Sequence, residues 1–208
     1  FMSLFNEKQI EIIIAAERLF AEEGFDGTSV RDIAKAANVN IAMISYYFGS
    51  KEKLLEALLL YRVSSMKLTL ESVSQENISP VEKMNKLIYT YVNRIHSNRC
   101  IYQILHFELS NKKRELNFKE FIQLKKENLK FIEAIVKEGQ EKGFYSNDIN
   151  IALLPTIIIG SYIHFHMNKV YYIDLLLLDT EEKYEKYIQE TLTPYIQKTI
   201  NALLTHEK

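Results

Sequence analysis

The sequence predicts an all-helical protein. Its 208 residues include only 6 Gly and 3 Pro, and both residue types interrupt helices. Apolar residues recur three and four positions apart along most of the chain, which is the spacing of one helix face. No strand-like alternation of apolar and polar residues is present in the sequence. We therefore predict a bundle of helices that is long enough to bury a core.

The first helix is predicted from about residue 6 to residue 23. Apolar residues between Ile12 and Phe20 fall at helical spacing, and the acidic residues fall mostly elsewhere. Gly24 follows the run where the C-terminal cap of a helix usually lies, with the apolar Phe25 behind it. A helix with one apolar face is therefore expected to open the chain.

Two short helices are predicted next. Ser29 and Asp32 form a variant of the capping box, so a second helix should begin near residue 29. It should stop by Asn38, because asparagine tolerates left-handed dihedral angles. Asn40 can then cap a third helix over residues 41–48.

Two short helices joined by a tight turn are typical of a helix-turn-helix. On the third helix, Ile41, Ile44 and Phe48 share one side and are expected to pack inward. The opposite side should carry Ala42, Met43, Tyr46 and Tyr47, with Ser45 at its margin. Exposed tyrosines suit either packing against another domain or contact with nucleic acid. Periodicity alone leaves both alternatives open.

The N-terminal quarter also resembles a known family. AAERLFAEEGFDGTSVRDIA at residues 15–34, AANVN at 36–40 and YYFGSKEKLL at 46–55 follow the opening of the tetracycline-repressor (TetR) family in order and without a gap. The resemblance covers about residues 10–57 and implies a dimeric, all-helical, ligand-responsive transcription regulator. Asn38 stands where the family usually has Gly, and Ser45 stands where it often has an aromatic residue.

The resemblance implies a set of DNA contacts. Hydroxyls and free amides at the start of the second helix would meet a phosphate; the alternative is simple capping. The side chains of residues 41–43 would meet base edges, although Ile41 can instead stay in the core. Tyr46, Tyr47 and Lys51 would contact the DNA backbone. The predicted DNA-binding residues are Thr28, Ser29, Arg31, Asn40, Ile41, Ala42, Met43, Ser45, Tyr46, Tyr47 and Lys51.

Charge argues for a local rather than a global DNA-binding surface. The net charge of the chain is -1, so no overall positive field attracts nucleic acid. Residues 1–55 themselves hold more acidic than basic side chains. We expect weak non-specific affinity, because neutralised phosphates supply most of that affinity.

The remaining chain reads as further helices. A fourth should run from Ser50 into the seventies, and Ser79, Pro80 and Glu82 mark the start of a fifth. We expect a short helix over residues 100–109 and a long one over 115–138, ended by Gly139 and Gly143. A strongly apolar helix, capped by Asn147 or Asp148, should span residues 149–173, followed by a last helix over 181–205. Pro194 must kink or split the last helix.

The two final helices, near 150–173 and 181–205, are the predicted homodimer elements. In the TetR family such helices pair with their symmetry mates as a four-helix bundle, which suits a palindromic DNA operator. Small residues, among them Ala152, Thr156 and Gly160, would let another helix approach closely. On the last helix we expect Tyr184, Ile188, Thr191, Tyr195 and Leu203 to share one side.

A small, largely apolar effector is expected in the second domain. Aromatic and polar-tipped side chains on its helices are typical of small-molecule sites. The predicted ligand-binding residues are Tyr91, Tyr102, His106, Phe121 and Tyr162. His164 and His166 diverge on a helix and make a poor metal pair, so we predict no metal site and no cofactor.

Two other classes of function are alternatives to a DNA-binding regulator. The sequence carries no nucleophile elbow, phosphate-binding loop or zinc helix motif, so an enzyme is not predicted. A helical adaptor that binds protein is the second alternative. No apolar run approaches the roughly 20 residues of a membrane helix, and a single cysteine, Cys100, suits the cytoplasm. We predict a helix-turn-helix DNA-binding domain over 1–55 and a helical ligand-binding and dimerisation domain over 56–208.

Overall fold

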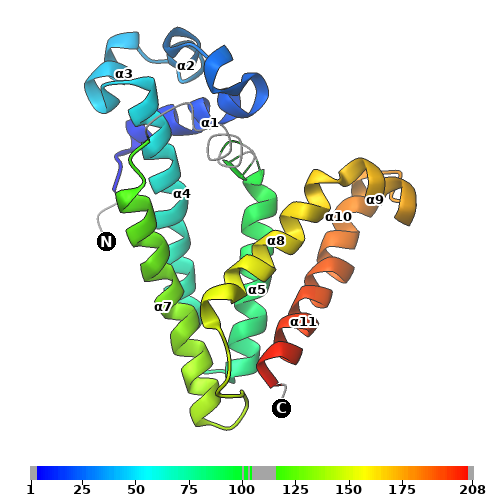
Figure 1. The fold of residues 1–208 in the computed structure, drawn as a ribbon. Helices are drawn as coiled ribbons and strands as arrows, with labels where there is room; N and C mark the ends of the chain where they lie inside the picture. Colours follow the sequence, from blue (N-terminus) through cyan, green and yellow to red (C-terminus); the bar gives the residue numbers. More distant parts are fainter. Residues whose placement is uncertain (1–3, 100, 103, 105–115, 206–208) are drawn as a thin grey trace. The chain divides into compact units, whose positions relative to one another are not determined.

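The computed structural model describes residues 4–99, 101–102, 104 and 116–205. Every regular element in those ranges is a helix, as the sequence predicts (Figure 1). The chain forms two compact units. The first unit comprises Phe1–Leu68 and Asn98–Glu127, and the second comprises Thr69–Ser97 and Asn128–Lys208.

Among the residues that the structure describes, α1 (Glu7–Gly27), α2 (Val30–Ala36) and α3 (Ile41–Phe48) lie wholly within the first unit. Two further helices, α4 (Lys51–Ser74) and α7 (Lys119–Glu141), contribute residues to both units. The other α-helices of the described ranges belong to the second unit: α5 (Pro80–Ser97), α8 (Leu154–Met167), α9 (Lys169–Leu176), α10 (Glu181–Tyr187) and α11 (Thr193–Thr205).

The starts of the short helices follow the predicted caps. The Ser29 hydroxyl accepts a hydrogen bond from the Asp32 amide at 3.1 Å, and the Asp32 carboxylate accepts one from the Ser29 amide. The Asn40 side chain accepts from the Ala42 amide at 2.9 Å. Asn38 has a φ of 51°, the left-handed conformation expected where α2 ends.

α1 is interrupted at Gly24, the residue predicted to end it. Its bounds are Glu7–Gly27, but Gly24 has a φ of 74° and a ψ of 165°, which are not helical. Glycine adopts this φ without steric cost. The predicted helix over about 6–23 is therefore confirmed, and a short further turn follows the kink, where the Thr28 amide donates to the Gly24 carbonyl at 3.2 Å.

One apolar cluster holds the first unit together. It joins one face of α1 to α2, α3 and the start of α4, and it includes two residues that precede α7 in the chain. Its fully or nearly fully buried members include Ile12, Ile13, Ala16, Phe20, Ile33, Ile44, Leu54, Leu55, Leu58, Ile101 and Ile104.

The prediction that Ile41 packs inward was wrong. Ile44 is buried, but Ile41 is 46% exposed. Ile41 is the first residue of α3, and helix side chains lean toward the N-terminus. Its side chain therefore projects past the start of the helix, outside the core that Ile44 enters.

The segment before α7 is only partly described. Arg99, Ile101, Tyr102 and Ile104 are helical, and the rest of the helix predicted over 100–109 lies outside the described residues. α7 begins at Lys119 rather than at 115. Its first amide, that of Lys119, donates to the side chain of Asn117 at 3.1 Å, which explains the later start.

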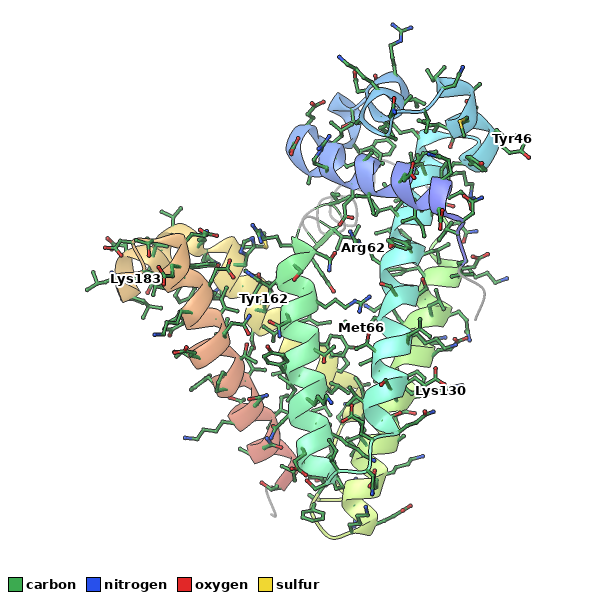
Figure 2. The ribbon with its side chains drawn as sticks, turned by 180° about the vertical axis from the view of Figure 1, so that it is seen from behind. Tyr46, Arg62, Met66, Lys130, Tyr162 and Lys183 are labelled. Carbon is green, nitrogen blue, oxygen red and sulfur yellow. The ribbon has the colours of Figure 1, made fainter. Side chains whose placement is uncertain are left out.

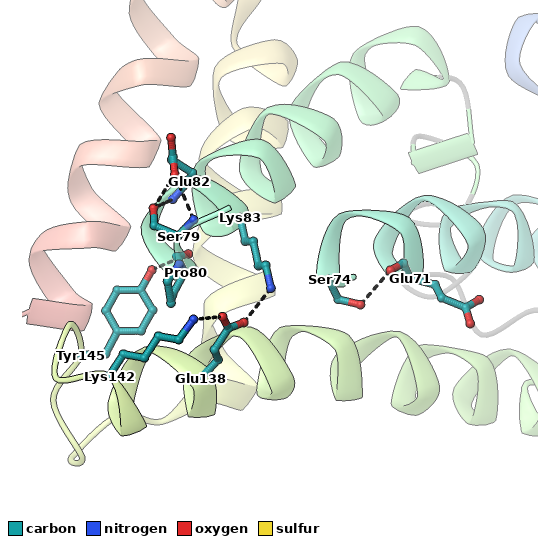
Figure 3. Close-up of polar contacts among 9 residues, drawn as sticks. All are labelled: Glu71, Ser74, Ser79, Pro80, Glu82, Lys83, Glu138, Lys142 and Tyr145. Atoms are coloured by element: carbon teal, nitrogen blue, oxygen red, sulfur yellow. Dashed lines mark hydrogen bonds and ion pairs between the residues drawn. The ribbon is translucent and has the colours of Figure 1, made fainter. Parts of the chain in front are cut away.

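α5 begins at a predicted capping box. The Glu82 amide donates to the Ser79 hydroxyl, and the Ser79 amide donates to the Glu82 carboxylate at 2.9 Å (Figure 3). Beside this box, the buried Lys83 ammonium donates to Glu138 of α7 at 2.7 Å. Hydrogen bonds from Lys142 and Lys83 lower the pKa of Glu138 below its ordinary value. Polar contacts thus join the start of α5 to the end of α7.

Gly139 does not end α7, contrary to the prediction. The helix continues to Glu141, and the chain turns at Gly143, where φ is 73°. A Cβ on Gly139 would lie 2.0 Å from the Tyr145 ring. Gly139 therefore leaves space for Tyr145, whose buried hydroxyl donates to the Pro80 carbonyl at 3.0 Å.

The helix predicted over 149–173 is broken. A 3₁₀ turn (Ile151–Leu153) precedes α8, and α8 and α9 are separate helices bent by 79°. Neither Asn147 nor Asp148 caps the start; Asn150 precedes the turn without a side-chain hydrogen bond. The break falls at Asn168, whose side-chain amide donates to the His164 carbonyl at 2.8 Å. No single helix of the described chain has the length and apolarity to cross a membrane, although α8 with its 3₁₀ turn and α9 would pass that test as one bent pair.

The last predicted helix contains a π-helical segment, Ile188–Leu192, between α10 and α11. The segment precedes Pro194, which has no backbone N–H to donate, and the Thr193 hydroxyl donates to the Ile188 carbonyl at 2.7 Å. The wider turn shifts the register of the residues that follow. Tyr184 and Ile188 are buried, but Thr191, Tyr195 and Leu203 are exposed, so the single predicted face was wrong. The buried series is Tyr184, Ile188, Thr193, Ile196, Ile200 and Leu204.

Candidate nucleic-acid interface

The outward face of α3 is formed by small and aromatic side chains. Ala42 and Ser45 are exposed, Met43 is half-buried, and Tyr46 is 84% exposed. Figure 2 shows Tyr46 extending outward from α3. On the opposite side of the same helix, Ile44 is buried in the core of the first unit. α3 is therefore anchored by one face and leaves the other accessible.

Tyr47 differs from Tyr46. Its ring is half-buried against the apolar cluster of the first unit and makes edge contacts with Tyr46 and Phe48 at centroid distances of 5.2 and 6.3 Å. Because it is partly buried, Tyr47 helps to hold α3 against the first unit, and its exposed part is a candidate contact for nucleic acid.

Thr28 and Lys51 are occupied inside the unit. Thr28 is buried, and its hydroxyl lies 2.8 Å from the Gly24 carbonyl and 3.1 Å from the Leu19 carbonyl. The Lys51 ammonium donates to the Phe25 and Thr28 carbonyls at 2.7 and 2.8 Å, and it lies 4.3 Å from the centre of the Phe25 ring. Both side chains tie the end of α1 to the start of α4.

The start of α2 presents a different arrangement. Ser29 and Arg31 are exposed. The Ser29 hydroxyl contacts the Asp32 carboxylate, and this bond and the one from the Ser29 amide lower the pKa of Asp32. Arg31 is the second residue of α2 and lies in its first turn, where a helix favours an anion. An exposed cation and an exposed hydroxyl thus lie close together at the start of α2.

Comparison with known proteins decides the class of this surface. Residues 12–58 match the family described as bacterial regulatory proteins, tetR family. Residues 62–172 match the C-terminal region of YsiA-like proteins. The chain belongs to the tetR family. Its members regulate transcription by binding DNA, so the helix-turn-helix of α2 and α3 is a DNA-binding element.

Individual relatives agree with the tetR-family assignment. The probable HTH-type transcriptional regulator YttP of Bacillus subtilis (strain 168) is 34% identical over 138 residues, 65% of this chain and 66% of YttP. The HTH-type transcriptional repressor NicS of Pseudomonas putida is 28% identical over 184 residues, 84% of this chain and 83% of NicS. FadR from Bacillus subtilis, solved in complex with stearoyl-CoA, shares the fold with a TM-score of 0.69 at 21% identity, over 96% of this chain and 99% of that chain.

The predicted ligand residues of this tetR-family chain are placed as follows. Tyr91 and Tyr162 are buried in the second unit. Tyr102 and Phe121 are half-buried against the apolar cluster of the first unit. His106 lies outside the described residues.

The second unit also contains a polar cluster that sequence reasoning did not assemble. His96 Nδ1 lies 2.7 Å from the Tyr162 hydroxyl, and His96 Nε2 lies 2.5 Å from the Glu185 carboxylate. The Tyr162 ring stacks on His166 at a centroid distance of 5.9 Å, and His166 Nδ1 lies 3.2 Å from the Tyr184 hydroxyl. These residues come from α5, α8 and α10, and no local sequence pattern connects positions 96 and 185.

In the described ranges, no group of three or more His, Cys, Asp or Glu side chains is placed to hold a metal ion. His96 and His166 each lie within hydrogen-bond distance of a tyrosine hydroxyl instead.

Proposed function

We propose that the protein is a ligand-responsive, sequence-specific DNA-binding regulator, a repressor that a small, largely apolar molecule releases from a palindromic operator. The proposal assigns DNA binding to residues 1–55 and ligand binding and dimerisation to residues 56–208. NicS is named a transcriptional repressor, and so is KstR2 of Mycobacterium tuberculosis, which is 24% identical over 156 residues. We further propose that the protein acts in the cytoplasm, without catalysis and without a cofactor.

The observation that carries the proposal is the anchored, outward face of α3. Short side chains at Ala42 and Ser45 let a helix lie deep in the major groove, and apolar atoms of Ile41, Ala42 and Met43 suit thymine methyl groups. The exposure of Ile41 supports a base-edge role, since its side chain is not used in the core. Base preference is therefore assigned to residues 41–43.

Backbone contacts are assigned to two places. The hydroxyl of Tyr46 on α3 and the side chain of Arg31 at the start of α2 are exposed and suit phosphates. Ser29 is exposed beside them, and its hydroxyl donates to a phosphate when it exchanges its bond to Asp32. Asn40 and Ser45 have exposed side chains that can add hydrogen bonds. Thr28, Tyr47 and Lys51 hold the two helices in place, and only the third proton of the Lys51 ammonium remains for a phosphate.

Dimerisation is assigned to the helices near 150–173 and 181–205. Ala152, Thr156 and Gly160 are exposed, and nothing lies within 4 Å of a Cβ built on Gly160. On α11, Tyr195 and Leu203 are exposed apolar side chains. Exposed small and large apolar groups on neighbouring helices suit a helix-on-helix interface.

The ligand proposal rests on the character of the second unit. Tyr91 and Tyr162 are buried among apolar helices, and Tyr162 offers a hydroxyl that is already bonded to His96. FadR, which shares the fold, was solved with stearoyl-CoA. We propose a lipid-like or aromatic compound with a weakly acidic or carbonyl group, and we keep Tyr91, Tyr102, His106, Phe121 and Tyr162 as its proposed contacts.

Gel-shift titration with DNA from upstream of the protein's own gene tests the DNA-binding proposal. Tyr46→Ala should weaken binding to operator and random DNA alike, because a backbone contact carries no base information. Met43→Ala should change which operator positions tolerate substitution. Lys119→Ala, an exposed cation on α7, is the control and should leave both unchanged.

The outcomes separate the proposed function from its rival. A protein adaptor would show no sequence-dependent shift with any DNA fragment. If Tyr46→Ala and Met43→Ala both keep the operator affinity of the unmodified protein, the assignment of α3 as the reading helix is wrong.

Thermal-shift screening followed by operator titration tests the effector. A compound that raises the melting temperature should also lower operator affinity, by about 5- to 150-fold for a coupling of about 1–3 kcal/mol. Tyr162→Phe should weaken that compound's effect without removing operator binding. Stabilising compounds that all leave operator affinity unchanged would contradict release by a ligand.

A further inference from the structure

A second surface of the first unit is built to meet another copy of itself. Glu11, Ile14 and Arg18 of α1 lie three and four positions apart, which places them along one side of the helix. We call these three residues the α1 stripe. Glu11, Ile14 and Arg18 are all exposed, and Ile14 is 49% exposed although it is a large apolar residue.

The α1 stripe borders a depression on the protein surface. The depression has a volume of about 340 Å³ and is lined by Glu11, Ile14, Ala15, Arg18, Ala36 and Ala37. The two alanines lie at the C-terminal end of α2, away from the residues proposed to meet DNA at its start. The lining of the depression thus includes the small apolar side chains of three alanines, together with one acidic residue, Glu11, and one basic residue, Arg18.

The order of charges makes the α1 stripe self-complementary. When two copies of α1 cross antiparallel with a two-fold axis between residues 14 and 15, residue 11 of one copy lies opposite residue 18 of the other. Two equivalent ion pairs then form, one on each side of the axis, each between Glu11 of one copy and Arg18 of the other. The two Ile14 side chains meet at the centre. A two-fold interface requires this reciprocity.

The present partners of these charges leave them available. Glu11 is paired with Lys8 on the protein surface, where both side chains are exposed and the pair is worth little. Arg18 has no ion pair or hydrogen bond among the residues that the structure describes. Beyond the stripe, Glu22 would face both Lys8 and Glu7 of the second copy, one attraction and one repulsion that largely offset each other.

We propose that two copies of this chain pair through the α1 stripe, each inserting Ile14 into the depression of the other. A single helix side buries much less than the roughly 800 Å² per partner of a stable complex. The pairing therefore needs copies that are already held close together, as on an operator, where the effective concentration is high. Only this dependence on DNA rests on the proposed function; the contact itself does not.

Cross-linking at position 14 tests the contact. Ile14→Cys in a Cys100→Ser background should be joined to a second copy by a short bis-maleimide, because the axis brings the two positions 14 together. Leu68→Cys in the same background is the control, since Leu68 is exposed on α4 and outside the stripe. Operator DNA should increase the yield for Ile14→Cys and leave the control unchanged.

Charge reversal gives the decisive comparison. Glu11→Arg or Arg18→Glu, each added to Ile14→Cys, should lower the yield about fivefold, because like charges then face each other twice. The double reversal should restore the yield, since the swapped charges again meet in opposite pairs. Glu23→Arg, an exposed charge of α1 off the stripe, should have no effect.

Each outcome bears on the pairing. A yield for Ile14→Cys no higher than for Leu68→Cys would overturn it and leave the depression to a different partner. A double reversal no better than the single ones would also overturn it. If the protein binds no operator, the proposed function fails, and cross-linking at high protein concentration without DNA still decides the pairing.

Discussion

A buried acid on α1 depends on one arginine of α4. Glu17 is 5% exposed, and its carboxylate accepts hydrogen bonds from Nε of Arg62 at 2.9 Å and from a terminal nitrogen of the same guanidinium. Figure 2 marks Arg62 on α4. An ionised carboxylate without its partner is costly away from water. The two residues are 45 positions apart, so helical spacing identified Glu17 only as a polar residue and did not reveal its partner.

Arg62→Met should therefore lower the free energy of unfolding by about 2–3 kcal/mol, somewhat below the 3–5 kcal/mol of fully buried pairs because Arg62 is partly exposed. Chemical denaturation measures the change. The control is Lys8→Met, which breaks the exposed Lys8–Glu11 pair and should change stability by less than about 0.5 kcal/mol. Equal changes in the free energy of unfolding for the two variants would show that burial does not strengthen the Glu17–Arg62 pair.

Gly139 offers a second test at the residue scale. Gly139→Ala would place a methyl group 2.0 Å from the Tyr145 ring, and overpacking of this kind costs about 1–3 kcal/mol. Gly27→Ala is the matched control, because the nearest atom to its Cβ is 3.6 Å away. Thermal unfolding should show a lower melting temperature for Gly139→Ala alone. A sequence interpretation found the glycine but assigned it to the helix end, because the close ring comes from a later segment.

Helix starts were more predictable than helix breaks. Ser29, Asn40 and Ser79 begin helices where their local sequence indicates, since capping needs only residues within three positions. The break at Asn168 was missed because asparagine interrupts a helix only when its side chain bonds to the backbone. Likewise, Pro194 indicated a disturbance, but the direction of the register shift came from a π-helical turn that no spacing rule specifies.

The capping boxes predict how stability depends on pH. Hydrogen bonds from Ser79 lower the pKa of Glu82 below 4.5, and those from Ser29 lower the pKa of Asp32 below 3.8. A lowered pKa in the folded state stabilises the protein above the unfolded value, and this contribution is lost as the pH falls through the folded value. The contribution of these two carboxylates to stability should thus be constant near neutral pH and decrease below about pH 4.5.

Glu82→Gln removes the titrating group and should make the decrease in stability at acidic pH less steep. Chemical denaturation at neutral and acidic pH measures this change in slope. Ser79→Ala should flatten the slope less than Glu82→Gln does, because it removes the hydroxyl that favours the charged carboxylate and leaves the bond from the residue-79 amide. A slope that neither substitution changes would assign the acid sensitivity to other groups, among them Glu138 beside Lys83 and Lys142.

At the scale of the whole molecule, the family could be predicted from the sequence more readily than the ligand contacts or the dimer helices. The N-terminal motif identified the family because DNA recognition confines its residues to one short segment. Ligand contacts come from side chains far apart in sequence, and the His96–Tyr162–Glu185 cluster illustrates the difficulty: it joins α5, α8 and α10. The dimer helices were chosen by composition, but the break at Asn168 divides their first member into α8 and α9.

Substitution of Gly160 tests the assembly of the molecule. Nothing within 4 Å would meet a Cβ at this exposed position of α8, so neither Gly160→Ala nor Gly160→Glu should clash within the chain. Gly160→Ala should be tolerated or slightly stabilising, because alanine favours a helix by about 1 kcal/mol over glycine.

Gly160→Glu would place a charge in the proposed interface, where an unpaired charge is costly. Light scattering should therefore show a dimer for the unmodified protein and a shift toward monomer for Gly160→Glu at an unchanged melting temperature of the monomer. Operator affinity should fall with dimerisation, since two reading helices must be about one DNA turn apart to bind a palindrome. A monomer at micromolar concentration for the unmodified protein, or a dimer that Gly160→Glu leaves intact, would contradict this interface.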